Sequence, residues 1–182
     1  MYLNDFKEAL LRTKKFGIKT PELEYCNKRF LDKSGAEEAS KAIQALGEFS
    51  VDEIAFQCLS INIKLYETLM NSLKTRVFYT IGFIAIDEDE YFKQTDASLK
   101  QMLKDGVKGP TVNLHAWLTL PSMEILDFSF PTSYGKLIGL PQMFGQVITG
   151  HADELTGGLK YYPMIVGAEF LYQAGVIKIE KI

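Results

Sequence analysis

The spacing of apolar residues predicts that the first third of the chain is helical. Between residues 2 and 16 the apolar side chains recur every three or four positions, which predicts an amphipathic helix with Asn4 or Asp5 as its cap. A second helix is predicted to begin at Ser34, whose hydroxyl can cap it, and to run to Leu46.

The segment 58–73 has apolar residues on more than one helical stripe. This pattern is typical of a central helix that is buried on most sides. Before it, Ser50 and Glu53 have the spacing of a capping box, which predicts another turn of helix. We therefore expect the rest of the chain to pack around residues 58–73.

Beyond residue 75 the pattern becomes that of β-strands. Residues 76–86 are rich in β-branched and aromatic side chains and predict the first strand. The runs 111–120 and 123–130 predict a hairpin that turns at 121–122, in which the numbers of opposed residues add to about 243. Shorter elements are predicted as a helix at 95–105, a strand at 160–167 in which Pro163 favours an edge, and a helix or strand at 169–174.

The order of these elements, helices first and antiparallel strands after, predicts an α+β fold. The chain has 182 residues, which suits one domain with its own hydrophobic core. Within this single domain, 1–182, we expect a helical part at 1–50, a core at 51–135 and a last part at 136–182 that completes the sheet.

Charge and composition argue against several classes of function. Twenty basic and 23 acidic residues give a formal charge of −3 without a long run of like charge, so nucleic acid is not expected as a partner. No apolar run reaches the ~18 residues of a membrane span, and the first residues lack the pattern of a signal peptide. We expect a cytoplasmic protein with no membrane partner, whose two cysteines are not needed as a disulfide.

Cys58, at the start of the predicted central helix, is the candidate nucleophile. The amide hydrogens and the dipole of a helix N-terminus favour a thiolate over a thiol. His115 and Asp127 lie on the two strands of the predicted hairpin and face each other to within about one residue of register, which implies β-carbons ~5 Å apart. A histidine at that position can take the thiol proton, and the acid can orient the imidazole ring.

The residues around these three groups resemble a known family. Gln57-Cys58 opens an apolar helix, Thr75-Arg76-Val77 begins the next strand, and Leu114-His115-Ala116-Trp117-Leu118 and Ile125-Leu126-Asp127-Phe128-Ser129 follow. This order is similar to the transglutaminase-like core of the papain-like cysteine protease superfamily, over roughly residues 50–135. The resemblance implies a papain-like fold in which Cys58 is the nucleophile, His115 the base and Asp127 the orienting acid.

Two positions depart from the family pattern. Leu59 follows the nucleophile where many relatives have arginine or another polar residue, and Ser129 stands two residues after the acid where threonine is usual. Papain-like enzymes use a glutamine upstream of the cysteine, whereas Gln57 is directly adjacent to it here. Gln57 and Trp117, which shares a strand face with His115, are the substrate-binding candidates, and the backbone amide of the cysteine is the expected oxyanion donor.

Each candidate also has a plainer interpretation. A cysteine in a helix is usually a small apolar core residue, Trp117 can simply pack in the core, and Asp127 can cap a turn. Cys26, in a polar segment, is interpreted as a structural or surface residue, and His151 as a solvated residue of an exposed loop. With two histidines and no glycine fingerprint, we expect neither a metal site nor a cofactor.

The sequence therefore predicts a cysteine enzyme that acts on a peptide, an isopeptide or another amide or acyl substrate through an acyl-enzyme intermediate. Peptidase, amidase and acyltransferase share this half-reaction, and the family likeness favours hydrolysis of a peptide or isopeptide bond. The alternative is a catalytically inactive papain-like module for binding or assembly, in which Cys58 only fills the central helix. The sequence leaves the oligomeric state open.

Overall fold

The computed structural model describes residues 1–109 and 111–177. The chain forms two compact units, and each is assembled from segments that lie far apart in the sequence. The first unit contains Met1–Glu22, Thr80–His115 and the described residues from Thr156 onward; the second contains Leu23–Tyr79 and Ala116–Leu155. Helices and antiparallel strands occur in both units, which confirms the predicted α+β class.

The first unit is built on three antiparallel strands. Strand β1 (Phe78–Ile86) pairs with β2 (Asp89–Tyr91) and with β6 (Leu159–Val166). Pro163 lies opposite Gly82, beside an irregularity in the β1 register, and β6 pairs with β1 alone among the described strands. The edge position predicted from this proline is therefore confirmed, because a residue without an amide hydrogen weakens a ladder least at an edge.

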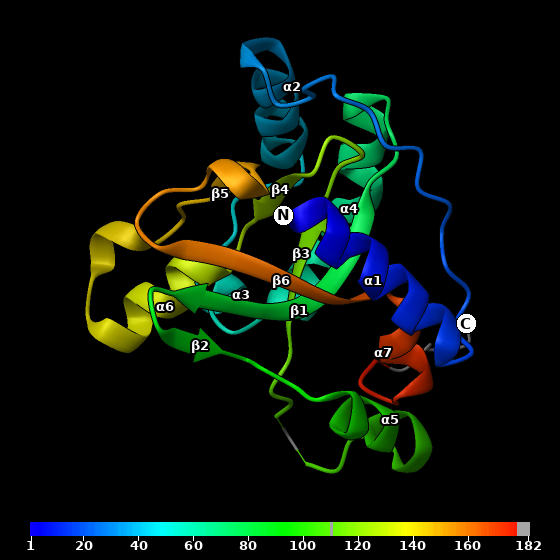
Figure 1. Ribbon diagram of the computed structural model, residues 1–182. Helices are drawn as coiled ribbons and strands as arrows, with labels where there is room; N and C mark the ends of the chain where they lie inside the picture. The colour runs from blue at the N-terminus through cyan, green and yellow to red at the C-terminus, as the bar shows by residue number, and fades with distance from the viewer. Residues whose placement is uncertain (110, 178–182) are drawn as a thin grey trace, which may run out of the picture. The chain divides into compact units, whose positions relative to one another are not determined.

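Helix α1 (Tyr2–Lys15) lies along β6 (Figure 1). Its buried residues are three or four positions apart, as expected for an amphipathic helix: Tyr2, Phe6, Ala9 and Thr13. The helix begins with Met1 as its cap rather than at Asn4 or Asp5, so the predicted caps were wrong by one turn.

Hydrogen bonds fasten α1 to strand β6. The Thr13 hydroxyl donates to Ala9 O (2.7 Å) and accepts from the Val166 amide (2.9 Å). Arg12 donates to the carbonyl of Met164 (3.2 Å), and its Nε lies 2.8 Å from the carboxylate of Asp96. The bonds to Met164 and Val166 join residues near the start of the chain to residues more than 150 positions later.

Two further helices belong to the first unit. Helix α5 (Asp96–Asp105) begins with a Thr95/Ser98 capping box and ends at Gly106, whose φ of +72° suits a residue without a β-carbon. Helix α7 (Glu169–Gln173) settles the choice left open for this segment in favour of a helix.

The second unit contains a second set of antiparallel strands. Strand β4 (Glu124–Asp127) pairs with β3 (His115–Thr119) and with β5 (Ile148–His151). All of β3 except its first residue, His115, belongs to this unit. Leu118 lies opposite Leu126 and Thr119 opposite Ile125, so the predicted hairpin is confirmed with its register within one residue.

Helix α4 (Cys58–Leu73) has the predicted bounds, and α2 lies beside it in the second unit (Figure 1). The predicted Ser50/Glu53 capping box is confirmed in front of α3. The cap of α2 is Asp32 rather than Ser34, because the Asp32 carboxylate accepts from the Gly35 amide at 2.9 Å. The remaining helical elements of this unit have the following bounds: α2 Lys33–Gln44, α3 Val51–Ile54, α6 Phe130–Ile138, η1 Pro141–Met143 and η2 Ala152–Glu154.

The strand predicted at 123–130 was wrong at its end. It stops at Asp127, and the chain turns at once into α6, a helix that the apolar pattern did not indicate. Pro131 lies in the first turn of α6, where its missing amide hydrogen would have had no helical partner. The strand pattern of 125–130 therefore gave way to a helix start that the proline favours.

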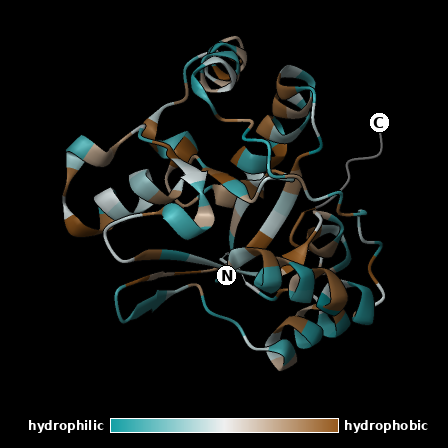
Figure 2. Cartoon of the chain, turned by 45° about the horizontal axis from the view of Figure 1, so that its top comes forward, coloured by the Kyte–Doolittle hydropathy of each residue, from teal (hydrophilic) through white to brown (hydrophobic). Residues whose placement is uncertain are grey.

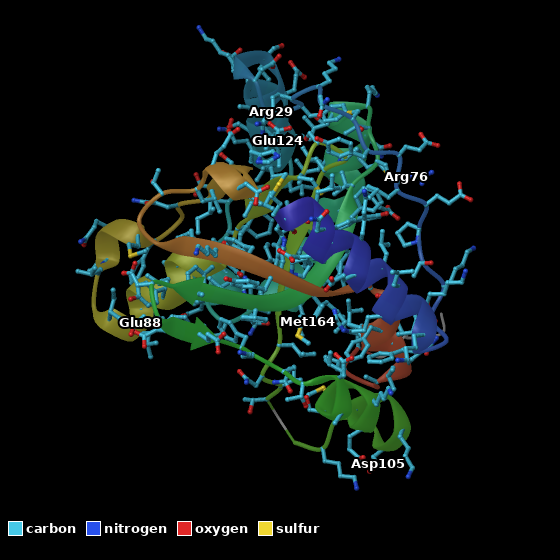
Figure 3. The ribbon with its side chains drawn as sticks, viewed as in Figure 1. Arg29, Arg76, Glu88, Asp105, Glu124 and Met164 are labelled. Carbon is cyan, nitrogen blue, oxygen red and sulfur yellow. The ribbon has the colours of Figure 1, made fainter. Side chains whose placement is uncertain are left out.

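A buried carboxylate holds the segment before α2 against the strands. Glu124 accepts hydrogen bonds from the amides of Phe30 (2.7 Å) and Leu31 (3.1 Å). Arg29 lies on the same side of the second unit (Figure 3) and pairs with Glu154 at 2.5 Å. The irregular stretch at 23–32 is thus attached through its backbone as well as its side chains.

Over residues 1–109 and 111–177, no helix is both long enough and apolar enough to cross a bilayer. Hydrophilic residues interrupt the hydrophobic ones along the helices (Figure 2).

Candidate functional site

Cys58 is the first residue of α4, as the sequence predicts, and is 7% exposed. The residue before it, Gln57, has the N-cap position but makes no side-chain capping hydrogen bond. The dipole of a helix N-terminus favours a negatively charged group at this position.

The turn that leads into α4 is strained at Phe56. This residue has a φ of +61°, in the left-handed region that bulky side chains rarely adopt, and it is 59% exposed. Its amide donates to Ser133 Oγ at 2.9 Å, so a side chain of α6 holds the turn. Strained backbone of this kind is often found at functional sites.

Asp127 is fully buried, and its Oδ1 holds the start of α6. It accepts from the amides of Ser129 and Phe130, both at 3.0 Å. The turn-capping role that the sequence left open for Asp127 is therefore confirmed. These hydrogen bonds use Oδ1, and the role of Asp127 toward the histidine stays a prediction.

A chain of hydrogen bonds joins Asp127 to the turn before Cys58. Asp127 holds the Ser129 amide, the Ser129 carbonyl accepts from Ser133 Oγ (2.7 Å), and Ser133 Oγ accepts from the Phe56 amide. The same hydroxyl thus donates to one backbone and accepts from another. The position of the Cys58 turn is coupled in this way to the end of β4.

Asn62, one turn into α4, makes a second connection. Its Nδ2 donates to the carbonyl of Cys58 and to the carbonyl of Ala116 in β3, both at 2.8 Å. Ala116 is the residue directly after His115. The first turn of the cysteine helix is therefore hydrogen-bonded to the strand that begins with the candidate histidine.

His115 is 2% exposed and belongs to the first unit. Its ring stacks on Phe92, with ring centres 5.0 Å apart and an angle of 22° between the planes. Phe92 has a φ of +66°, so a second strained aromatic residue accompanies a candidate group. Packing against an aromatic ring restricts the orientation of the imidazole.

The two substrate-binding candidates differ in exposure. Gln57 is exposed, and its Oε1 accepts from Ser60 Oγ at 3.4 Å. Trp117 is fully buried in the core, which matches its plainer interpretation as a packing residue. His151 is the last residue of β5, paired with Glu124, rather than part of an exposed loop; its Nδ1 accepts from the Asp153 amide at 3.2 Å.

The second unit therefore holds four of the five residues predicted for the site, and the first unit holds the remaining one. Cys58, Asp127, Gln57 and Trp117 belong to the second unit, and His115 is the last residue of its segment in the first. In the part of the chain that the structure describes, no group of three or more histidine, cysteine, aspartate or glutamate side chains is arranged to hold a metal ion.

An apolar cavity of about 430 Å³ lies elsewhere in the second unit, between α2 and the strands. Leu126 and Phe128 line it. Because successive side chains of a strand point to opposite faces, Asp127 points away from this cavity. The cavity is therefore separate from the candidate site.

Sequence reasoning did not find Phe56, Asn62 and Ser133. The conformation of Phe56 leaves no signal in the pattern, and Ser133 lies in a helix that was not predicted. Asn62 had a signal, because it is a polar residue on the buried stripe of α4 formed by Cys58, Ile61, Leu65 and Leu69.

Comparison with protein-family models, with curated proteins and with solved structures gave no match for this chain.

Proposed function

We propose that the chain is a cysteine enzyme of the transglutaminase-like, papain-like kind, which acts on a peptide, an isopeptide or another amide or acyl substrate. The observation that carries the proposal is the hydrogen-bond chain from Asp127 through Ser129 and Ser133 to the turn before Cys58. It links two of the three residues that the resemblance assigns to catalysis.

Three local features support this function. The candidate nucleophile is the first residue of a 16-residue helix, where amide hydrogens and the helix dipole favour a thiolate. The turn that precedes it is strained and held by a side chain. The candidate acid is buried, and backbone amides hold one of its oxygens, which fixes its direction.

In the proposed reaction, the Cys58 thiolate attacks the substrate carbonyl carbon, and the electron pair of the C=O bond moves to the oxygen. The backbone amide of Cys58 donates a hydrogen bond to that oxyanion. The imidazolium of His115, oriented by Asp127, gives its proton to the leaving amine as the C–N bond breaks, which leaves a thioester. Water or a second amine then attacks the thioester, His115 takes its proton, and the thiolate leaves.

Two observations favour the second candidate function, a catalytically inactive module for binding or assembly. Cys58 is only 7% exposed, as a packing cysteine would be. Leu59 stands where many members of the resembling family have a polar residue.

The pH dependence of Cys58 alkylation by iodoacetamide, followed by peptide mass spectrometry between pH 5 and 9, separates the two functions. An enzyme would show Cys58 alkylation that persists below pH 7, and His115→Ala would lower the rate at pH 6 on the order of 100-fold, because an ordinary thiol is ionised only near pH ~8.5. Cys26 in the same sample serves as the reference thiol.

A generic acyl donor provides the second measurement. Incubation with p-nitrophenyl acetate should add one acetyl group to Cys58 and release p-nitrophenol continuously as the thioester is hydrolysed. The Cys58→Ala variant should show neither. If Cys58 reacts only above pH 8 and is insensitive to His115→Ala, the enzyme proposal is wrong and the module remains.

A further inference from the structure

Asn62 is a polar residue where the packing of α4 calls for an apolar one. It is fully buried and lies on the same helix stripe as Ile61, Leu65 and Leu69. Its carboxamide nitrogen uses both of its hydrogens, one toward Cys58 O and one toward Ala116 O. A single side chain therefore spans from the cysteine turn to strand β3.

The other half of the carboxamide makes the residue unfavourable for stability. Asn62 Oδ1 is buried and has no hydrogen-bond partner among the described residues. An unsatisfied buried acceptor costs about 1–3 kcal/mol. A leucine would avoid this cost but would leave the buried Ala116 carbonyl without its donor, so what distinguishes the asparagine is the pair of hydrogen bonds that it donates.

We propose that Asn62 is a positioning residue, which fixes the first turn of α4 against β3 and so sets the direction in which Cys58 presents its sulfur. This inference rests on the proposed enzyme function. The two donated hydrogen bonds, rather than the packing of the side chain, determine how Cys58 reacts.

The chemistry of the side chain explains why asparagine is suited to this role. The two acceptors are carbonyl oxygens, so the bridging group must donate twice from one point, and a primary amide nitrogen does so in a fixed plane. A serine at the same position has one hydroxyl hydrogen, which can bond to the carbonyl four residues earlier in the helix but cannot also bond to strand β3. An ionised aspartate would donate to neither.

The test uses Asn62→Leu and Asn62→Ser in the full-length chain. Asn62→Leu keeps the branched shape of the side chain and removes both hydrogen bonds, whereas Asn62→Ser keeps a donor for Cys58 O and removes the bond to Ala116. Asn71→Leu is the matched control, because Asn71 is an exposed residue of the same helix. The readout is the pH profile of Cys58 alkylation, at a temperature where circular dichroism shows each variant to be folded.

We expect Asn62→Leu to lower the alkylation rate at pH 6 at least tenfold and to move the midpoint of the profile toward that of Cys26. Asn62→Ser should change the profile in the same direction, and Asn71→Leu should leave it unchanged. If Asn62→Leu does not fold, Asn62→Ser alone decides the question.

The outcomes separate this inference from the function on which it rests. A wild-type chain without alkylation of Cys58 below pH 7, or without an effect of His115→Ala, would contradict the proposed function. Wild-type-like profiles in both Asn62 variants, beside a strong effect of His115→Ala, would overturn only the positioning role. A rate that falls equally at every pH, with an unchanged midpoint, would also overturn it, because that result reports altered access to the sulfur.

Discussion

Strand β4 begins and ends with a buried acid, and the two acids hold different parts of the second unit. Glu124 engages both of its oxygens with the backbone of the segment before α2, through the amides of Phe30 and Leu31. Asp127 uses Oδ1 alone for the amides of Ser129 and Phe130. One acid is thus a structural clamp, and the other combines a local capping role with the role proposed in catalysis.

The difference extends beyond the two side chains. The Glu124 end of β4 leads to an irregular segment and the cap of α2. The Asp127 end leads through Ser133 to Phe56 and the turn of the candidate nucleophile. Stability and proposed chemistry should therefore respond separately to changes at the two ends of a strand of four residues.

Asp127→Asn should have the largest effect on chemistry. The amide oxygen of asparagine can still accept from the two amides, so the unfolding midpoint should remain within a few degrees of the wild type. The loss of the carboxylate should lower hydrolysis of p-nitrophenyl acetate by about 10²- to 10⁴-fold, as expected for an acid that orients a catalytic histidine. Equal turnover in the variant and the wild type would contradict the proposed catalytic role of Asp127.

Glu124→Gln should lower stability and leave turnover unchanged. One carboxylate oxygen becomes an NH₂ group that faces an amide hydrogen, so a charge-assisted hydrogen bond is lost and a donor is left without an acceptor. We expect the free energy of unfolding to fall by about 2–3 kcal/mol in urea denaturation. The turnover of the folded fraction should not change.

An exposed glutamate provides the control for this second variant. Glu88 lies on the surface of the first unit (Figure 3), so Glu88→Gln should alter neither stability nor turnover. A loss of turnover in folded Glu124→Gln would show that the two ends of β4 are not separable.

Ser133→Ala removes the connection between α6 and the Phe56 turn. The Phe56 amide would lose its acceptor, and a strained turn would lose its support, which should cost about 1 kcal/mol in unfolding free energy. We also expect a several-fold lower alkylation rate of Cys58 at pH 6. Ser34→Ala, at an exposed position of α2, is the matched control and should change neither quantity.

Lys136 lies at the outer surface of the same region, and Lys136→Met should have the smallest effect on the free energy of unfolding. The ammonium group of Lys136 donates a hydrogen bond to Asp52 at 2.7 Å and attracts its charge, and both effects lower the pKa of Asp52. The stabilisation from this lowered pKa is complete above the ordinary carboxyl pKa of about 4 and is lost as the pH falls through the folded-state value.

In Lys136→Met, an NMR titration should therefore show the pKa of Asp52 returning toward its ordinary value. The pKa of Glu53 provides the internal control. It is lowered by hydrogen bonds from the Ser50 amide and hydroxyl, which the substitution leaves in place. A coincident change in Glu53 would mean that α3 has moved as a whole.

Much of the fold was predictable because local patterns dominate where a single face is buried. The stripe of α1, the bounds of α4 and the hairpin of β3 and β4 follow from spacing and turn residues. The end of β4 did not follow, because 125–130 alternates like a strand and the helix start depends on Pro131 and on a carboxylate two residues before the cap. Strand β5 was missed because its four residues, Ile148–His151, carry a weak pattern.

For the candidate site, the position of Cys58 at a helix start and the capping role of Asp127 were predictable from residue type and spacing. The connections between them were not. Ser133 acts through a hydroxyl that bonds two backbones, and Asn62 through an amide that bonds two carbonyls, so both depend on tertiary contacts. An asparagine within an apolar helix stripe is nevertheless a signal that sequence reading can use.

The contact between Thr13 and Val166 has a consequence for the order of folding. The amphipathic face of α1 packs against residues 159–166, which are synthesised long after α1 itself. Until then Phe6 and Ala9 face water or a chaperone. Chains terminated before this strand should accordingly aggregate, and folding during synthesis should begin in the second unit, whose last segment ends at Leu155.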